Sequence, residues 1–424
     1  MSNAPLTFQR PDNRPLLLLN DFLDKTLSSV IALVLLAVLL LNQTHIETND
    51  KVKLLGSLEL LLRLAFTGIA GLIGLYGFLF EPKVRAVFFS FPGAWVLGML
   101  SFWALGTLCS PYLAYASPYL ITTTAITLFS PYAFYVLGTK RFVNVVLASM
   151  GLTIAGSWFL YLVMPEYGVM IEFTSLTESV PRMGGTSHPN ILAGVAALMM
   201  VIVAYLGFEG KRSWLFCLPL LVIGIITLQL TGTRVAAIAG VVSVLTVYRR
   251  FWMRPDVLPF TAALAVAAVV AAMVLFTSEG SNPITESLVG STRSGDIEEI
   301  SSFTGRAEIW EYVIKMVGER PLQGYGPGVS KLYLEKEQML LHAHNSVLHL
   351  AFAGGVFAGA FGLMMFLQQL FVSIGGQYRL AAMLSFVTIL NSLTEVPVFD
   401  YLPGTTTILW LAAIFWPMLD DGSL

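Results

Sequence analysis

Charged residues are scarce in this chain. They make up 12% of the sequence, whereas hydrophobic residues make up 56% and the mean hydropathy is +0.75. A typical soluble domain carries about twice this share of charge. Apolar runs of about twenty residues recur along the chain, and each is long enough to cross a bilayer as a helix. The composition therefore predicts an all-α polytopic membrane protein.

Other absences narrow the function. The formal net charge is only −2, so no overall basic field favours nucleic acid as a partner. Cys109 and Cys217 are the two cysteines and fall near opposite membrane faces in the topology below, which argues against a disulfide framework. No P-loop or serine nucleophile elbow occurs. The acidic stretch 296–299 resembles a divalent-metal site, but its Ser and Gly neighbours are typical of a solvated loop, so we expect no metal and no other cofactor.

The apolar runs predict twelve transmembrane helices. Most Lys and Arg residues of the short loops lie on the side shared with the N-terminus, and the positive-inside rule assigns that side to the cytoplasm. Lys51 and Lys53 are the exceptions. Both termini are therefore predicted to be cytoplasmic, with an uncleaved first span. The approximate spans are 27–43, 55–80, 86–108, 116–138, 142–164, 189–207, 213–230, 233–248, 258–277, 344–372, 379–396 and 403–419.

A long polar stretch between the ninth and tenth spans is predicted to lie outside the membrane on the opposite face. It divides the chain into N-terminal membrane helices (1–276), an outer loop or lid (277–343) and C-terminal membrane helices (344–424). Apolar residues at helical spacing over 306–317 predict an amphipathic helix that could lie on the membrane surface. The Gly and Pro residues of 321–328 predict a turn after it.

Polar motifs stand where the even-numbered spans begin. In this topology these helix N-termini face outward, and their free N–H groups and positive dipole end favour anions. Residues 182–190 open the sixth span, with Thr186 or Ser187 as the expected cap. Residues 231–234 open the eighth span and 344–345 open the tenth.

Two arginines suggest an anion site. Arg234 and Arg306 each lie in or beside the first turn of a predicted helix, where a cation opposes the dipole by about 0.3–1 kcal/mol. An anionic ligand would reverse that sign, and the planar guanidinium group suits phosphate oxygens. The alternative is that Arg234 reaches lipid headgroups and Arg306 is a solvated loop residue.

The histidines differ in placement. His344 lies at the predicted interface beside Asn345, with His342 two residues before it, and a neutral imidazole there can take a proton from a hydroxyl group. A histidine at an aqueous helix end can also be structural, and that alternative stays open. His188 precedes a proline and is expected to help cap its helix. Among weaker polar signals, Glu395 and Asp400 are expected to line a cavity near the outer end of the eleventh span.

Five short motifs follow one another along the chain. They are Gly-Thr-Ser-His-Pro-Asn at 185–190, Thr-Gly-Thr-Arg at 231–234, Thr-Gly-Arg-Ala-Glu-Ile-Trp at 304–310, Gly-Tyr-Gly-Pro-Gly at 324–328 and His-Ala-His-Asn-Ser at 342–346. Their order resembles that of the O-antigen ligase and O-antigen polymerase superfamily. The resemblance covers about residues 180–360, and only the topology supports it in the N-terminal half.

The resemblance implies a glycosyltransferase of the bacterial inner membrane with a periplasmic active site. The implied partners are membrane lipids, an undecaprenyl diphosphate-linked O-antigen as donor and, in a ligase, a sugar hydroxyl of the lipid A core as acceptor. The essential histidine of the family maps to His344, with His342 as its nearest rival. The arginines of the family map to Arg234 and Arg306, with Arg182 as a third.

These residues are compatible with a single inverting displacement that needs no metal. His344, oriented by Asn345, would act as the general base, and the arginines would stabilise the lipid diphosphate that leaves. Two other functions remain open. An O-antigen polymerase would use a second undecaprenyl-linked glycan as acceptor, although the single dominant loop favours a ligase. A secondary transporter could also have twelve spans, but the polar motifs collect at one face and no inverted repeat is apparent.

Overall fold

The structure is a computed structural model. It describes residues 14–43, 53–173, 179–254, 306–337, 342–400, 403–420 and 422, and the statements below concern these residues. The predicted ninth span (258–277) and the acidic stretch 296–299 lie outside the described residues.

The described chain is mainly helical. The hairpin of β1 (Val169–Phe173) and β2 (Ser179–Met183) is antiparallel and was not predicted. The helices are α1 (Arg14–Gln43), α2 (Lys53–Phe80), α3 (Pro82–Phe88), α4 (Phe91–Leu108), α5 (Leu113–Val163), α6 (Pro165–Gly168), α7 (Pro189–Phe208), α8 (Trp214–Thr231), α9 (Arg234–Val247), α10 (Arg249–Trp252), α14 (Arg306–Glu319), α15 (Ser330–Lys336), α16 (Ser346–Gly375), α17 (Arg379–Ser392) and α18 (Thr405–Leu419).

Every predicted span other than 258–277 falls mainly on described helices, so the chain is a helical polytopic membrane protein. Seven described helices are long and apolar enough to cross a membrane, and α9, α17 and α18 are shorter apolar helices. Helix α5 contains two of the predicted spans, which meet at the non-helical Gly138 (φ 65°, ψ 166°). The third predicted span is broken instead between α3 and α4, because Ser90 starts a new helix by accepting a hydrogen bond from the Gly93 N–H. The full count of twelve stays a prediction.

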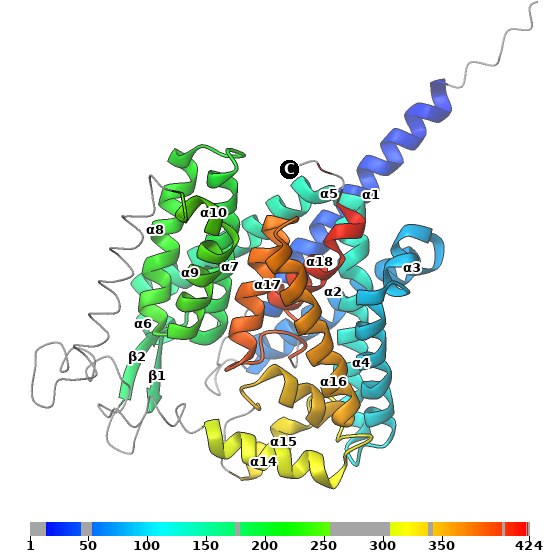
Figure 1. The fold of residues 1–424 in the computed structure, drawn as a ribbon, viewed down its shortest axis with the longest axis vertical. Coiled ribbons are helices and arrows are strands. Elements are labelled where there is room, and N and C mark those ends of the chain that lie inside the picture. The colour runs from blue at the N-terminus through cyan, green and yellow to red at the C-terminus, as the bar shows by residue number, and fades with distance from the viewer. Residues whose placement is uncertain are drawn as a thin grey trace, which may run out of the picture.

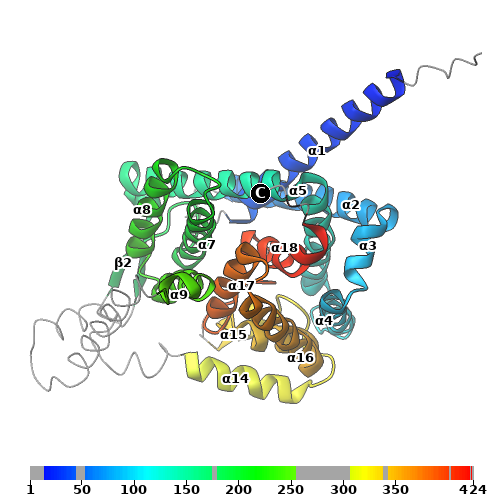
Figure 2. The same ribbon diagram turned by 45° about the horizontal axis from the view of Figure 1, so that its top comes forward.

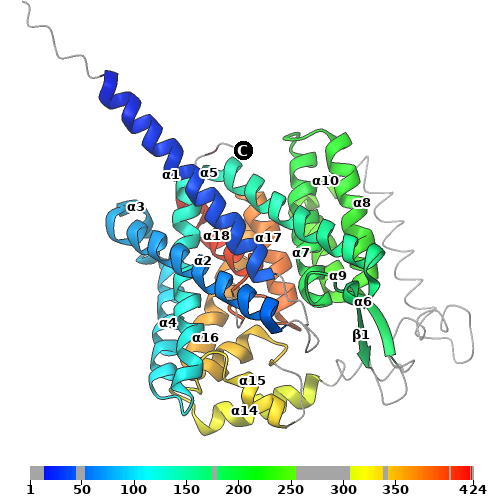
Figure 3. The same ribbon diagram turned by 180° about the vertical axis from the view of Figure 1, so that it is seen from behind.

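The helices form two neighbouring groups. In Figure 1, α7 to α10 lie beside α16, α17 and α18, while α4 packs on the other side of α16. Seen from behind in Figure 3, α1 and α2 run across the same bundle together with α5. Large apolar side chains stay exposed on the outer helices, as at Leu72 (70%) and Leu215 (88%), where lipid tails would cover them.

The two ends of the bundle carry different structures. Helices α14 and α15 lie across one end, next to the start of α16, as Figures 1 and 2 show. Basic loops gather at the other end, where Arg141 donates to Ser28 and Arg379 pairs with Glu209. This grouping agrees with the predicted separation of basic loops from the outer loop.

Helix α16 is broken, and the chain before it fills the break. Gly354 and Gly355 depart from helical geometry, and a loop supplies the missing partners: the Val356 N–H donates to the Pro321 carbonyl (2.7 Å) and the Tyr325 N–H donates to the Phe352 carbonyl (2.9 Å). Such partners are what a kinked helix requires when water is excluded. The contacts fix the segment before α15 against α16.

Helix α14 is amphipathic, as predicted, but its apolar face packs on the protein. Ile309, Val313 and Met316 are buried in a second core with Ala116 of α5 and Phe352 of α16. This corrects the expectation of a helix lying on the membrane surface. The packing places Arg306, the first residue of α14, near the start of α16 and the segment after α17.

Candidate active site

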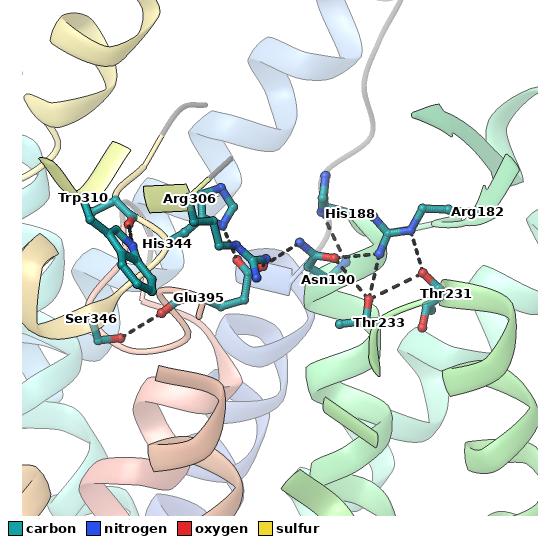
Figure 4. A network of polar contacts seen from close by, with 11 residues as sticks. Arg182, His188, Asn190, Thr231, Thr233, Arg306, Trp310, His344, Ser346 and Glu395 are labelled. Atoms are coloured by element: carbon teal, nitrogen blue, oxygen red, sulfur yellow. Dashed lines mark hydrogen bonds and ion pairs between the residues drawn. The ribbon is translucent and has the colours of Figure 1, made fainter. Parts of the chain in front are cut away.

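One carboxylate joins several helices at the end of the bundle that α14 covers. Glu395 follows α17, and its Oε1 accepts hydrogen bonds from Arg306 Nη2 (2.7 Å) and Asn190 Nδ2 (3.0 Å). Its Oε2 lies 3.1 Å from His344 Nδ1. Figure 4 shows these side chains converging on Glu395 from α14, α7 and the segment before α16. The Glu395 side chain is only 15% exposed, so the pairing occurs largely away from bulk water.

The network continues from Asn190 to the hairpin. Asn190 Oδ1 accepts from Arg182 Nη2 (2.7 Å) and from Thr233 Oγ1 (3.1 Å), while Arg182 Nε donates to the Thr231 carbonyl (2.7 Å). Arg182 is 3% exposed, so its guanidinium group ties β2 to α7 and to the turn between α8 and α9. A continuous chain of hydrogen bonds thus runs from the hairpin to the start of α16 (Figure 4).

The backbone around His344 is constrained. His344 has a positive φ of 47°, a conformation that costs a non-glycine residue about 1–3 kcal/mol and persists only when its surroundings enforce it. Asn345 caps α16, because its Oδ1 accepts from the Leu348 N–H (3.1 Å), and its Nδ2 donates to the Leu393 carbonyl (3.2 Å). Trp310 Nε1 donates to the Ala343 carbonyl (3.0 Å) on the other side. These bonds hold His344 in place from both neighbours.

The contact with Glu395 sets the hydrogen-bonding role of His344. A carboxylate accepts the proton on Nδ1, which leaves the Nε2 lone pair of the neutral ring for another partner. Burial by itself would raise the pKa of Glu395, but the hydrogen bond with His344 and nearby positive charge, including that of Arg306, lower it to about 2. Glu395 is therefore ionised at neutral pH and can orient the imidazole.

His342 stands beside His344 but has a different environment. The two ring centroids are 4.0 Å apart, and the buried Nδ1 of His342 has no hydrogen-bond partner among the described residues. Burial lowers the pKa of His342 to about 3, and the neighbouring His344 adds to this effect. His342 is therefore neutral at pH 7, and no carboxylate of the described residues forms a direct hydrogen bond with its ring.

A metal ion has to be weighed at this cluster. Potential ligand atoms of His342, His344 and Glu395 lie within 4.8 Å of one another. However, Arg306 already contacts the Glu395 carboxylate at 2.7 Å, which brings a fixed positive charge to the place where a cation would bind. The charges of the cluster favour an internal ion pair over a metal site.

The other predicted site residues have separate roles. Arg234 is exposed at the start of α9 and makes no hydrogen bond or ion pair within the described part of the chain. His188 caps α7, as expected, and its Nδ1 accepts from the Asn190 N–H (3.3 Å). This corrects the predicted cap at Thr186 or Ser187. The Thr186 and Ser157 hydroxyl groups lie 2.8 Å apart instead, which joins the segment before α7 to α5.

Two residues of the network were not selected from the sequence. Glu395 was expected only to line a cavity, and Asn190 was noted only as part of a helix-opening motif. The usable signal for Glu395 was an acidic residue beside Pro397 at a predicted span end, since ionisable groups at such positions are costly without a partner. Nothing in the sequence indicated that its partners would be Arg306 and Asn190.

Comparison with known proteins gives a match to part of this site. Residues 219–366 match the family model described as O-antigen ligase. The matched region includes Arg234, Arg306 and His344, and it ends before Glu395. A search of curated proteins gives no match. The family match and the helical membrane fold together support membership of the O-antigen ligase and polymerase superfamily.

Proposed function

We propose that the chain is an O-antigen ligase. It transfers a polysaccharide from undecaprenyl diphosphate to a sugar hydroxyl of the lipid A core, without a metal and with inversion at the anomeric carbon. The observation that supports this most directly is the His344–Glu395 pair at 3.1 Å, because it gives a buried imidazole the fixed orientation that a general base requires.

The proposed reaction is one displacement. The acceptor hydroxyl oxygen attacks the anomeric carbon, its proton passes to Nε2 of His344, and the bond from the anomeric carbon to the diphosphate oxygen breaks. Glu395 accepts the Nδ1–H hydrogen bond throughout and stabilises the imidazolium that forms. The diphosphate leaves as an anion and needs little acid assistance. The acceptor hydroxyl group is a weak nucleophile, so the reaction depends mainly on the general base that removes its proton.

The three arginines have different roles in the proposed reaction. Arg234 is the most accessible, because it is exposed and has no partner within the described residues, so we assign it direct contact with the diphosphate. Arg306 contacts Glu395 and supplies positive charge beside the base. Arg182 is committed to carbonyl, amide and hydroxyl oxygens, which favours a role in positioning Asn190 and the α9 start over direct binding.

The proposed location follows from the two ends of the bundle. The end with His344 faces the periplasm, and the basic loops and both termini face the cytoplasm of an inner membrane. The polyprenyl chain of the donor would lie among membrane lipids with its diphosphate at the α9 and α16 starts. The free N–H groups of these two helix starts would add to the attraction for the anion.

A transfer assay tests the proposal. The purified chain in detergent would be given undecaprenyl diphosphate-linked glycan with either lipid A core or a second lipid-linked glycan as acceptor. We expect product only with lipid A core, with an inverted anomeric linkage and an unchanged rate after addition of a chelator. Product formed on the second lipid-linked glycan would identify a polymerase, and no product with either acceptor would leave the transporter alternative.

His344→Ala tests the base in the same assay. The rate should fall by about 10²–10⁴, because the hydroxyl group loses its proton acceptor while the protein keeps its fold. His45→Ala is the matched control, since it also removes one histidine from the predicted outer face. Full activity of His344→Ala, with loss of activity in His342→Ala, would move the role to His342.

A further inference from the structure

A polar cavity lies at the end of the bundle opposite His344. It has a volume of about 340 Å³ and is formed by the ends of α7 and α9, by α10 and by the turn between α16 and α17. Figure 1 shows α10 in the upper half of the molecule and α14 and α15 at the bottom. The site proposed for glycan transfer therefore does not include this cavity.

The lining of this cavity has an excess of positive charge. Arg249, Arg250 and Arg379 face one carboxylate, Glu209, so three positive charges meet one negative charge. That carboxylate is already used, because its Oε1 accepts from Arg379 Nη1 (2.6 Å) and from the Tyr248 hydroxyl (2.9 Å). Two guanidinium groups are left without an acidic partner in the lining.

These two guanidinium groups are positioned differently. Arg249 donates to the Thr246 carbonyl (3.2 Å) and the Ile374 carbonyl (2.9 Å), which fixes its orientation at the ends of α9 and α16 without neutralising its charge. Arg250 is exposed and has no hydrogen bond or ion pair within the described part of the chain. A fixed and a free guanidinium group side by side suit the oxygens of a phosphate diester.

The surroundings favour a lipid as the source of that phosphate. Below the cavity, α9 and α16 expose apolar side chains such as Leu245 (47%) and Phe371 (71%). Acyl chains can lie on these surfaces while the headgroup enters the cavity. Basic pockets between transmembrane helices near a membrane surface attract anionic lipid headgroups.

We propose that this cavity binds the phosphate headgroup of an anionic phospholipid. The bound lipid would bridge α9, α10 and the α16–α17 turn, and it would neutralise the excess charge of Arg249 and Arg250. Because α17 begins in the cavity wall and ends three residues before Glu395, the lipid would also stabilise the helix that leads to the candidate active site.

Lipid titration tests this site. The full-length chain in neutral detergent would be titrated with phosphatidylglycerol, phosphatidylcholine and inorganic phosphate. Native mass spectrometry would count bound lipid, and the melting midpoint would report stabilisation. We expect phosphatidylglycerol alone to bind and to raise the midpoint. An equal rise of the midpoint with phosphatidylcholine would overturn the proposal. A rise with inorganic phosphate but not with phosphatidylglycerol would overturn it as well.

Arg250→Glu locates the binding. Its side chain makes no hydrogen bond or ion pair with the described residues, so the variant should keep its fold. The reversed charge should weaken phosphatidylglycerol binding about tenfold or more. Arg212→Glu is the control, because Arg212 is an exposed arginine at the same end but outside the cavity lining. Arg250→Gln serves as a milder second variant and should weaken binding less. Equal losses in the Arg212 and Arg250 variants would mean nonspecific surface attraction and would contradict a defined site.

Discussion

The arginines at the two ends of the bundle differ in their partners. At the end that contains His344, the buried arginine has oxygen partners. At the opposite end, two arginines line a cavity and have no acidic partner in its lining. Arg182 is 3% exposed and donates to Thr231, Asn190 and Thr233. Arg250, in contrast, is exposed and makes no hydrogen bond with the described residues. The two ends therefore place the same side chain in different environments.

The difference follows from the cost of burying charge. A buried guanidinium group without partners would lose several kcal/mol of hydration, so a buried arginine has to be paired and then becomes part of the framework. An exposed arginine keeps its hydration and can exchange it for a ligand. Arg234 is exposed at the His344 end, so its guanidinium group is hydrated and available for a ligand, as that of Arg250 is and that of Arg182 is not.

Removal of the negative charge of Glu395 should have the largest effect on the transfer rate. Glu395→Gln keeps the size of the side chain but gives Arg306 and His344 a neutral partner, so the ring loses its preferred tautomer. We expect the transfer rate constant to fall by about 10²–10⁴, while the KM for the donor changes little, because the effect acts through the base.

Two comparisons separate this positioning role from a merely structural one. Glu395→Asp keeps the charge and should recover part of the rate, and the pH–rate profile of Glu395→Gln should shift relative to that of the unmodified chain. Asp400→Asn, a change of the same type in the same segment, should leave both readouts unchanged. A Glu395→Gln variant with the unmodified rate and pH profile would remove Glu395 from the mechanism.

The paired and unpaired arginines of the His344 end should respond differently to lysine. Lysine cannot reproduce the three bonds of Arg182, so Arg182→Lys should lower the melting midpoint together with activity. Arg234→Lys loses no bond in the described structure and should keep the unmodified midpoint. Its KM for the donor should rise by about tenfold, because an ammonium group replaces a bidentate contact to diphosphate.

Melting curves and donor titrations check this pair of variants. Each variant is the control for the other, since both replace arginine by lysine at neighbouring elements. An unchanged donor KM in Arg234→Lys would favour the alternative that this arginine contacts lipid headgroups. A stable and fully active Arg182→Lys variant would show that the bonds of Arg182 are dispensable.

The sequence was sufficient to place most of the described helices. Each span is apolar along its own length, so its position could be predicted without knowledge of its neighbours. His344 and Asn345 were also recognisable, because a helix start and its cap are local features. The break in α16 was not predicted, since Gly354 and Gly355 depart from helical geometry only with Pro321 and Tyr325 bonded beside them.

The centre of the network could not be predicted from local pattern. Glu395 is separated from Arg306 by 89 positions and from Asn190 by 205 positions. Which buried polar groups meet depends on how α7, α14 and α17 pack, and hydropathy contains no information about that packing. The sequence placed an acid at a span end, and the structure supplied its partners.

The smallest expected effect concerns His342 and the pH dependence of stability. The folded chain holds the pKa of His342 at about 3, below the ordinary value of 6.5, so the unfolded chain binds a proton first as the pH falls. Stability should therefore decrease on acidification from about pH 6.5 to pH 5. In this window Glu395 adds little, because its ordinary pKa is 4.5 and folding lowers it further.

The melting midpoint of His342→Gln should vary less between these pH values than that of the unmodified chain. Equal slopes would mean that His342 takes up its proton equally readily in the folded chain, and the contrast between a neutral His342 and a carboxylate-oriented His344 would then fail.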